Sequence, residues 1–294
     1  MEMLKSGFGL LEAPIWDRDL GLLFADTDRG GILCLNEALD VWTIVPHRRG
    51  IGGAVRHASG GLVVSGRNIA YKSAATSETV VLLQNDSARG IVGFNDITTD
   101  SKGRIYAGAL GFVPTHTPMS GIGSDSRSAP LFLIDLDGST RPVFPDVKLT
   151  NGLGFSPDGS ILYHADSGDQ RVYKFDVSSD GSLSNRLPFM SVSTGLPDGL
   201  AVSEDGSVWV AIAHGGRVLR YNPEGVLETE IEFPLPMITS LCFGGDDMKD
   251  IYVVSGSDGT GRSGAGSVFR LRSDVPGLKI TPARVLVPSE SDKT

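Results

Sequence analysis

An internal repeat of a turn followed by an apolar strand limits this chain to a few architectures. Six segments carry it: IWDRDLGLLFADT, VRHASGGLVVSG, ITTDSKGRIYAG, GFSPDGSILYHAD, AVSEDGSVWVAIA and CFGGDDMKDIYVVSG. The equivalent positions in the strand, 39 to 57 residues apart, are Phe24, Val63, Tyr106, Tyr163, Trp209 and Tyr252. A repeat of this length is typical of a propeller blade built from four strands.

Further strand-like segments complete each repeat. A third strand is predicted at ILCLN, LFLIDL, RVYKFDV, RVLRYN and SVFRLR, and a weaker fourth strand at VWTIV, VVLLQ and RVLVP, the last spanning 284–288. Glycine (38 residues) and proline (16 residues) punctuate the whole chain, and no long segment has a helical period. The sequence therefore predicts an all-β fold, a single six-bladed β-propeller domain over 1–294 with four antiparallel strands per blade. A solenoid is the competing architecture, but radial closure leaves only short, protected sheet edges. The repeat does not specify which strand closes the ring.

One interval is longer than the others because it contains an insertion at 109–129, ALGFVPTHTPMSGIGSDSRSA. It is predicted to be a loop between the second and third strands of the third unit. Long loops in compact domains are either functional lids or disordered, and both interpretations stay open. Phe112 and His116 of this loop are candidates for contacts with a substrate.

Composition excludes several classes of partner. The formal net charge of −9, from 26 basic and 35 acidic residues, argues against nucleic acid, whose backbone requires basic patches. The N-terminal segment MEMLKSGFGL does not resemble a signal peptide, and no apolar run approaches the roughly 18 residues of a membrane span. We expect a cytoplasmic monomer or homodimer without a membrane partner. Cys34 and Cys242 lie in apolar segments and are expected to be buried hydrophobes.

The repeat also aligns a set of polar residues. Five residues before the first turn of each repeat, one position is occupied in turn by Glu12, Gly52, Asn95, Asn151, Asp198 and Thr239. In a propeller these positions ring one end of the central channel, and four of them carry a carboxylate or a carboxamide. Oxygen ligands of this mixed kind suit a hard divalent cation.

Turn chemistry is the alternative explanation for two of these positions. Asn-Gly and Asp-Gly before a strand are common turn dipeptides. Glu12, in Glu-Ala-Pro, is not part of a turn motif, and its carboxylate is costly to bury unless it is paired or bound to a metal. We therefore interpret the four residues as a metal site.

Segments along the whole chain also resemble a known family. LLEAPIWD, GFNDITTDSKGRIYAGAL, LTNGLGFSPDG, GLPDGLAVSEDGSVWVAIAHGGRVLR and TSLCFGGDDMKDIYV are similar to the senescence-marker-protein, gluconolactonase and luciferin-regenerating-enzyme family, from about residue 8 to residue 271. The resemblance implies a six-bladed propeller that hydrolyses lactones with one divalent metal in the channel. It implies that Glu12, Asn151 and Asp198 are metal ligands and that Asn95 contacts the metal or the substrate.

One position departs from the family pattern. Sugar-lactone members often carry an arginine two residues before the asparagine, and this chain has Gly93 there, in IVGFND. A guanidinium suits hydroxyl-rich or carboxylate ligands. Its replacement at this substrate-contacting position favours a less hydroxylated or a bulkier lactone.

The expected reaction is the opening of a lactone ring to the hydroxy acid. A divalent metal polarises the lactone carbonyl and lowers the pKa of a water molecule, Asp198 accepts the proton of that water, and Asn95 orients the substrate. All-oxygen ligation makes calcium the first choice, with magnesium, manganese, zinc and iron left open. His214, in a turn near the channel mouth, is a further candidate for substrate contact.

Other chemistries are less compatible with the sequence. The five histidines show no zinc-binding spacing, and there is no G-x-S-x-G motif of a serine hydrolase. Two alternatives stay open: a metal-dependent hydrolase or isomerase acting on a non-sugar ester or lactone, and a non-catalytic propeller that serves as a binding scaffold.

Overall fold

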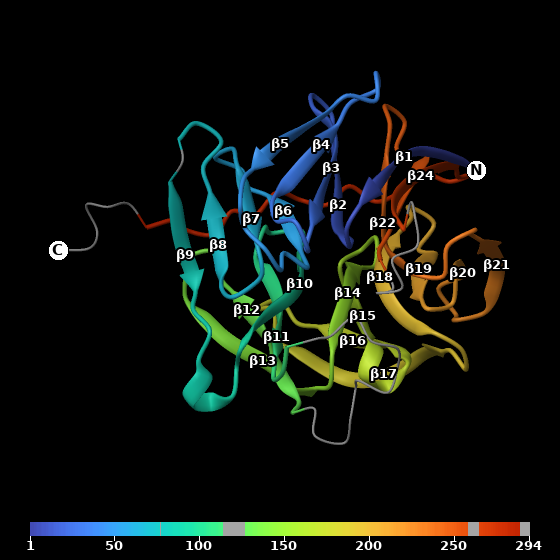
Figure 1. Cartoon of the computed structure of the whole chain (residues 1–294). Helices are drawn as coiled ribbons and strands as arrows, with labels where there is room; N and C mark the ends of the chain where they lie inside the picture. The colour runs from blue at the N-terminus through green and yellow to red at the C-terminus, as the bar shows by residue number, and fades with distance from the viewer. Residues whose placement is uncertain (77, 114–126, 258–264, 289–294) are drawn as a thin grey trace.

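The six-bladed propeller is present as predicted. The computed structural model describes residues 1–76, 78–113, 127–257 and 265–288. Over these residues the strands form six antiparallel sheets of four strands each, arranged as blades in a ring (Figure 1). The predicted insertion falls between β11 and β12, and its part at 114–126, which includes His116, lies outside the described residues.

Each blade runs from an inner strand at the channel to an outer strand at the rim. The inner strands are β2 (Leu11–Asp17), β6 (Ala54–Arg56), β10 (Gly93–Thr99), β14 (Thr150–Phe155), β18 (Leu196–Val202) and β22 (Ile238–Gly244). The second strands are β3 (Gly21–Asp26), β7 (Leu62–Val64), β11 (Ile105–Leu110), β15 (Ile161–Asp166), β19 (Val208–Ala213) and β23 (Asp250–Ser255). The third strands are β4 (Ile32–Leu35), β8 (Ile69–Lys72), β12 (Ala129–Ile134), β16 (Arg171–Val177), β20 (Arg217–Tyr221) and β24 (Gly266–Arg272). The outer strands are β5 (Val41–Val45), β9 (Thr79–Leu83), β13 (Thr140–Val147), β17 (Leu183–Ser191), β21 (Leu227–Glu232) and β1 (Glu2–Phe8). Two short 3-10 turns, η1 (Ser87–Arg89) and η3 (Ser167–Asp169), follow β9 and β15.

The hydrophobic core lies between neighbouring blades. The repeat-equivalent side chains that define the sequence pattern all lie in second strands and are buried. Tyr106 of the third blade, for example, packs in one cluster with Leu153 and Phe175 of the fourth. Burying a side chain of this size contributes about 1.5–3 kcal/mol relative to exposure. The apolar alternation of each strand therefore holds blade against blade, and with it the ring.

The ring is closed by the N-terminal strand, which corrects one expectation. β1 pairs antiparallel with β24 and is the outer strand of the sixth blade, with Glu2 opposite Arg270 and Phe8 opposite Gly266. The segment at 284–288, predicted as that fourth strand, is not in the sheet. Its apolar alternation fits any sheet edge, so the sequence pattern alone could not choose between the two termini.

The C-terminal segment instead crosses one end of the ring and passes behind the blades in Figure 1, where it is red. Leu278 donates its backbone N–H to Val202 O (2.9 Å), and Arg284 donates to Gly103 O (2.8 Å). The Ala283 N–H donates to Arg56 O (2.8 Å). These bonds tie the segment to blades five, three and two at the end of the channel where the inner strands finish.

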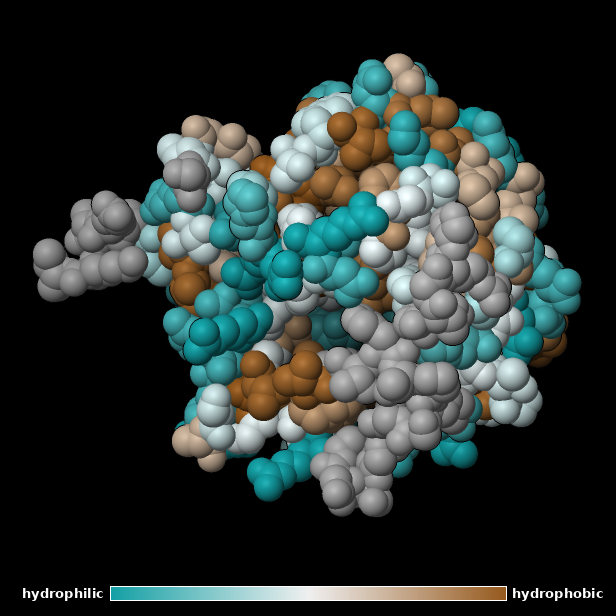
Figure 2. All heavy atoms as spheres, viewed as in Figure 1, coloured by the Kyte–Doolittle hydropathy of each residue, from teal (hydrophilic) through white to brown (hydrophobic). Residues whose placement is uncertain are grey.

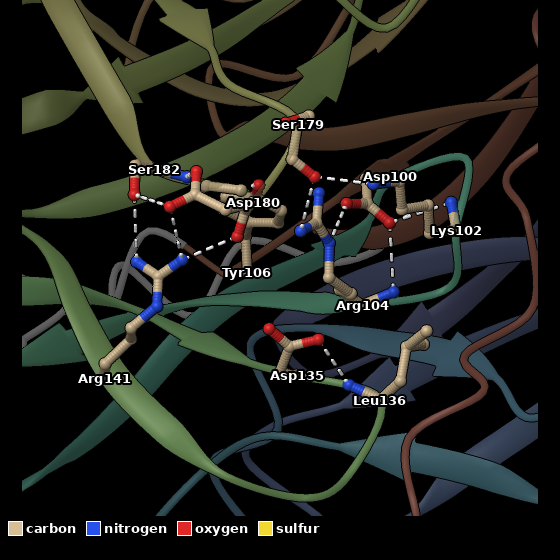
Figure 3. Close-up of polar contacts among 11 residues, drawn as sticks. Asp100, Lys102, Arg104, Tyr106, Asp135, Leu136, Arg141, Ser179, Asp180 and Ser182 are labelled. Atoms are coloured by element: carbon tan, nitrogen blue, oxygen red, sulfur yellow. Dashed lines mark hydrogen bonds and ion pairs between the residues drawn. The ribbon is translucent and has the colours of Figure 1, made fainter.

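Polar side chains join the third blade to the fourth at the same end of the ring (Figure 3). The Arg104 Nε donates to Asp100 Oδ2 (2.6 Å), and its Nη1 donates to Ser179 O (3.2 Å). The Tyr106 hydroxyl donates to Gly181 O (3.0 Å). Arg104 and Asp100 are each only 5% exposed, so their charges depend on one another rather than on water.

In the described part of the chain, no helix has both the length and the apolar character that a membrane span needs.

Replacing Arg104 with alanine is expected to destabilise the fold by about 3 kcal/mol, because it leaves the buried Asp100 carboxylate without its partner. Chemical denaturation at pH 7.5 measures the change. The double variant Asp100→Asn, Arg104→Ala removes both charges and is expected to recover at least half of the loss. A double variant no more stable than the single one would contradict this account.

Candidate active site in the central channel

The four residues predicted to form the metal site all lie where the inner strands begin, and each of these strands is irregular at that point. Register shifts occur in β2 between Glu12 and Ile15, in β10 between Phe94 and Ile97, in β14 between Thr150 and Leu153, and in β18 between Pro197 and Leu200. A β-bulge redirects side chains out of the regular alternation. The bulges therefore present Glu12, Asn95, Asn151 and Asp198 at the start of the channel instead of in the pleat.

The glycines that follow Asn151 and Asp198 allow close packing and do not form a tight turn. A Cβ on Gly152 would lie 2.3 Å from the Leu200 nitrogen, and a Cβ on Gly199 would lie 2.0 Å from Ser240 Oγ. Neither glycine has a positive φ. The Asn-Gly and Asp-Gly dipeptides thus allow neighbouring inner strands to approach, which removes the turn interpretation for these two positions.

The two asparagines are joined across blades three and four. Asn95 Nδ2 donates to Thr150 O (2.8 Å) and also to Asn151 Oδ1. Both of its amide protons are used, so its remaining polar atom, Oδ1, is an acceptor. Gly52 leaves room for that atom, because a Cβ there would lie 2.1 Å from Asn95 Oδ1.

Three carboxylates share the same region and repel one another. Burial, followed by the charges of Asp198 and Asp96, raises the pKa of Glu12 well above its ordinary value. Burial and the charge of Asp96 likewise raise the pKa of Asp198. Burial raises the pKa of Asp96 to about 7, although a hydrogen bond from the Ile97 N–H opposes the shift. These directions show that the charged forms of the three carboxyl groups are disfavoured here, as expected for acids that lack a compensating positive charge.

Asp96 is a functional candidate that the sequence interpretation missed. It stands next to Asn95 in GFNDITT, one residue away from the repeat-equivalent position. A strict alternation of side chains would point it away from the channel, and only the bulge in β10 brings it in. The Asn-Asp pair near the start of the third inner strand was the available signal.

The donor set fits a hard cation. Across the described residues, the Glu12 carboxylate has no hydrogen bond and no ion pair, and no Lys or Arg is paired with Asp96 or Asp198. Carboxylate and amide oxygens without a basic partner are the ligands that Ca²⁺ and similar ions take. No group of three or more His, Cys, Asp or Glu side chains meets the geometry of a metal site in the described ranges, and the predicted set has only two carboxylates beside the amide of Asn151.

A cavity of about 700 Å³ lies in the channel, farther along the inner strands than these residues. Asp96 lines the cavity near the start of the inner strands, and the C-terminal residues 278–282 line it at the end of the channel where these strands finish. The surface is hollowed at the middle of the ring, with hydrophilic side chains in the hollow (Figure 2). Asp96 therefore lies between the candidate ligands and the interior of the channel.

The other residues predicted to contact the substrate, Gly93, Phe112 and His214, lie in different parts of the propeller. Gly93 begins β10, and a Cβ there would lie 2.9 Å from Gly66 O, so the backbone of blade two occupies the side-chain space. The exposed Arg67 has its Cα 3.6 Å from the same point. Phe112 is half-buried just beyond β11. His214 lines a separate pocket with residues of β21, towards the rim of the fifth blade.

His164 belongs to the packing beneath the site. It is fully buried in β15, its Nε2 is 3.2 Å from Thr150 Oγ1, and burial lowers its pKa to about 3. The buried Asp166 carboxylate accepts the backbone N–H groups of Lys148 (3.2 Å) and Leu149 (3.0 Å). Both residues support the segment that leads into Asn151.

Comparison with known proteins identifies the family of this chain. The family model described as SMP-30/Gluconolactonase/LRE-like region matches residues 10–257. A 6-deoxy-6-sulfogluconolactonase of Pseudomonas putida is 30% identical over 90% of this chain and 92% of its own length. Regucalcin of Danio rerio is 32% identical over 83% of this chain and 82% of its own length. The solved structure of a luciferin-regenerating enzyme superposes with a TM-score of 0.84 at 22% identity, covering 97% of this chain and 99% of the other.

The charge at Asp96 makes a prediction for the metal-free protein. Because the pKa of about 7 in the folded state lies above the unfolded value of about 4, the protonated carboxyl favours the fold. The stability that this gives is lost as the pH rises from about 4 through about 7. Asp96→Asn should therefore stabilise the metal-free protein by about 2 kcal/mol at pH 8 and by less at pH 5. Denaturation at the two pH values in the presence of a chelator measures both gains.

The exposed Asp146 provides the matched control, since Asp146→Asn removes the same charge outside the channel. It is expected to change the stability by less than about 0.5 kcal/mol at either pH. Equal effects of the two substitutions would show that burial in the channel does not penalise the charged Asp96 carboxylate as described.

Proposed function

The chain belongs to the SMP-30/gluconolactonase/LRE-like family, and from that membership we propose that it is a divalent-metal-dependent lactonase. The substrate in this proposal is a small-molecule lactone, and the product is the ring-opened hydroxy acid. The observation that carries the proposal is the concentration of uncompensated carboxylate charge beside two amide oxygens at the start of the channel. The names of the two similar enzymes, a sulfogluconolactonase and a luciferin-regenerating enzyme, agree with small-molecule chemistry in this family.

Glu12, Asn151 and Asp198 are the residues that would hold the metal. They come from β2, β14 and β18, and all their ligand atoms are oxygens, for which calcium is our first choice. A divalent ion held there supplies Lewis acidity towards the lactone carbonyl and makes water a stronger acid. Burial, followed by repulsion from neighbouring carboxylates, raises the pKa values of Glu12 and Asp198, and a cation at this place would relieve both effects.

The side chains of the protein divide the remaining work between them. Asp198 is the base that accepts the proton of the attacking water at a carboxylate oxygen, because it is buried and close to the charge of Glu12. Asn95 offers its remaining acceptor, Oδ1, to a substrate hydroxyl or to the ion, while its Nδ2 is held by Thr150 O and Asn151 Oδ1. Such fixed polar groups orient the substrate without further cost at the moment of reaction.

The surroundings of Gly93 suggest another source for a guanidinium at the substrate. The backbone of Gly66 fills the space beside Gly93, and the exposed Arg67 starts alongside it. A guanidinium there suits a lactone that carries hydroxyl or anionic groups. A bulkier or less hydroxylated lactone stays the alternative, and a panel of aldonolactones, acidic sugar lactones and aromatic lactones separates the two.

Asp198→Ala is expected to lower kcat/KM for lactone hydrolysis at least 100-fold, because a positioned base contributes about that much or more. A pH-stat or indicator assay with added metal measures the change. The control is Asp176→Ala, which removes a carboxylate on the third strand of the fourth blade, away from the channel, and should leave the rate within twofold. An Asp198→Ala protein that keeps more than a tenth of the activity would not have Asp198 as its base.

Removal of the metal is expected to abolish hydrolysis and its return to restore it. Treatment with a chelator, followed by addition of Ca²⁺, Mg²⁺, Mn²⁺ or Zn²⁺ in separate samples, tests this by activity and by the metal content of the purified protein. With about three protein ligands the ion should exchange readily, so more than one metal is expected to restore activity. Full activity in the metal-free protein would contradict the proposal, and a protein inert towards every lactone would favour a binding scaffold.

A further inference from the structure

We propose that Ser167 is a positioning residue of this site, whose hydroxyl fixes the orientation of the Asn151 side-chain amide so that its oxygen, and not its nitrogen, is offered as a ligand. This role rests on the proposed function in one respect, since it takes Asn151 as a ligand of the metal. It assigns a task to a buried hydroxyl that does not itself touch metal or substrate.

The hydroxyl lies between the two blades that carry candidate ligands. Asn151 Nδ2 donates to Ser167 Oγ at 2.6 Å, and Ser167 Oγ donates to Pro197 O at 2.5 Å. Pro197 directly precedes Asp198 in β18. Ser167 begins η3, immediately after β15, and is 1% exposed. One side chain therefore links the strand segments of Asn151 and Asp198.

The direction of these bonds determines which way the amide faces. The hydroxyl has a single proton, and Pro197 O, which can only accept, takes it. Ser167 Oγ can then only accept from Asn151, which requires the NH₂ group on that side. The opposite side of the amide presents Oδ1, which accepts from Asn95 Nδ2.

An Asn151 amide rotated by half a turn would lose its hydrogen bonds on both sides. Its oxygen would face a Ser167 oxygen whose proton is already used, and its nitrogen would face the Asn95 nitrogen, which is itself a donor. The chain from Asn95 through Asn151 and Ser167 to Pro197 therefore has one consistent direction. Cations bind the oxygen of an amide and not its nitrogen, so this direction decides whether Asn151 is a ligand.

The first blade supplies an internal comparison. Thr27 has the same place there, because its N–H donates to Leu10 O (2.8 Å) as the Ser167 N–H donates to Leu149 O (3.0 Å). The Thr27 hydroxyl is buried but has no hydrogen-bond partner among the residues that the structure describes. The candidate ligand of that blade is Glu12, whose two carboxylate oxygens are equivalent and need no choice of orientation. The Ser167 hydroxyl therefore forms hydrogen bonds in the fourth blade, where the candidate ligand is the amide of Asn151. The Thr27 hydroxyl forms none among the described residues of the first blade, where the candidate ligand is the carboxylate of Glu12.

The test measures metal affinity directly. Full-length protein is stripped with a chelator and titrated with CaCl₂ or MnCl₂ in an isothermal calorimeter. Ser167→Ala is expected to raise the Kd for the metal at least tenfold, since removing the hydrogen-bonding partner of a ligand typically costs about 10–100-fold in affinity. Ser167→Thr keeps the hydroxyl, at a position where the first blade accommodates threonine, and is expected to stay within threefold of the wild type.

Two matched controls separate positioning from the general cost of losing a buried hydroxyl. Ser255 is buried in the sixth blade and donates to Ala265 O at 2.6 Å, so Ser255→Ala removes a similar bond without touching Asn151. Thr27→Val removes the idle hydroxyl. Both are expected to leave the metal Kd within twofold of the wild type, even where Ser255→Ala lowers the melting temperature as much as Ser167→Ala does.

A third comparison asks whether the effect acts through the amide. In an Asn151→Asp background the ligand is symmetric, so adding Ser167→Ala should change the Kd less than threefold. If Ser167→Ala does not fold, Ser167→Cys, whose thiol is only a weak donor and acceptor, is measured in its place with the same expectation.

The proposed role of Ser167 is overturned if Ser167→Ala binds metal as tightly as the wild type, if Ser255→Ala weakens binding equally, or if the full loss persists in the Asn151→Asp background. None of these results depends on turnover. A wild-type protein that binds metal but hydrolyses no lactone would refute the proposed function and leave the role of Ser167 standing. A wild-type protein that binds no divalent metal would refute both.

Discussion

The pairing of β1 with β24 closes the ring, and the geometry of the channel follows from it. The pairing joins the first blade to the last through backbone hydrogen bonds from Glu2 opposite Arg270 to Phe8 opposite Gly266. β2 follows β1 at once, so the position of Glu12 is fixed by the same pairing. Without closure the first blade would keep its side-chain packing on the sixth and the hydrogen bond from the Thr239 hydroxyl to Leu11 O, but it would lose the backbone pairing that fixes Glu12 near Asp198.

The channel gives up stability where the candidate site is built. The inner strands are bulged at the positions that carry the polar side chains, and Ala13, beside Glu12, adopts a left-handed φ of 52° that costs a non-glycine residue energy. Burial, and after it the charges of neighbouring carboxylates, raises the pKa values of Glu12 and Asp198. Tight apolar packing between the blades offsets these costs. A regular channel without charged groups would be more stable, but it would not attract a cation.

The two ends of the channel are lined by different parts of the chain. At the end where the inner strands begin, amide and carboxylate groups converge, and hydrogen bonds from Asn95 and Ser167 hold the amide of Asn151. At the other end the C-terminal segment crosses the ring, with Leu278 bonded to the fifth blade and Ala283 to the second. The fold therefore leaves one end of the channel to polar side chains and covers the other with backbone.

The amino-acid sequence was sufficient to predict the number of blades, the number of strands in a blade, and the common position of Glu12, Asn95, Asn151 and Asp198, because side-chain alternation and repeat spacing are local properties of the chain. It was not sufficient to predict which terminus closes the sixth blade, since the pattern at 284–288 fits a sheet edge as well as β1 does. The repeat also passed over Asp96 and Ser167. Their positions depend on a bulge and on hydrogen bonds between blades, which became visible only in the folded chain because these contacts join segments that no repeat spacing relates.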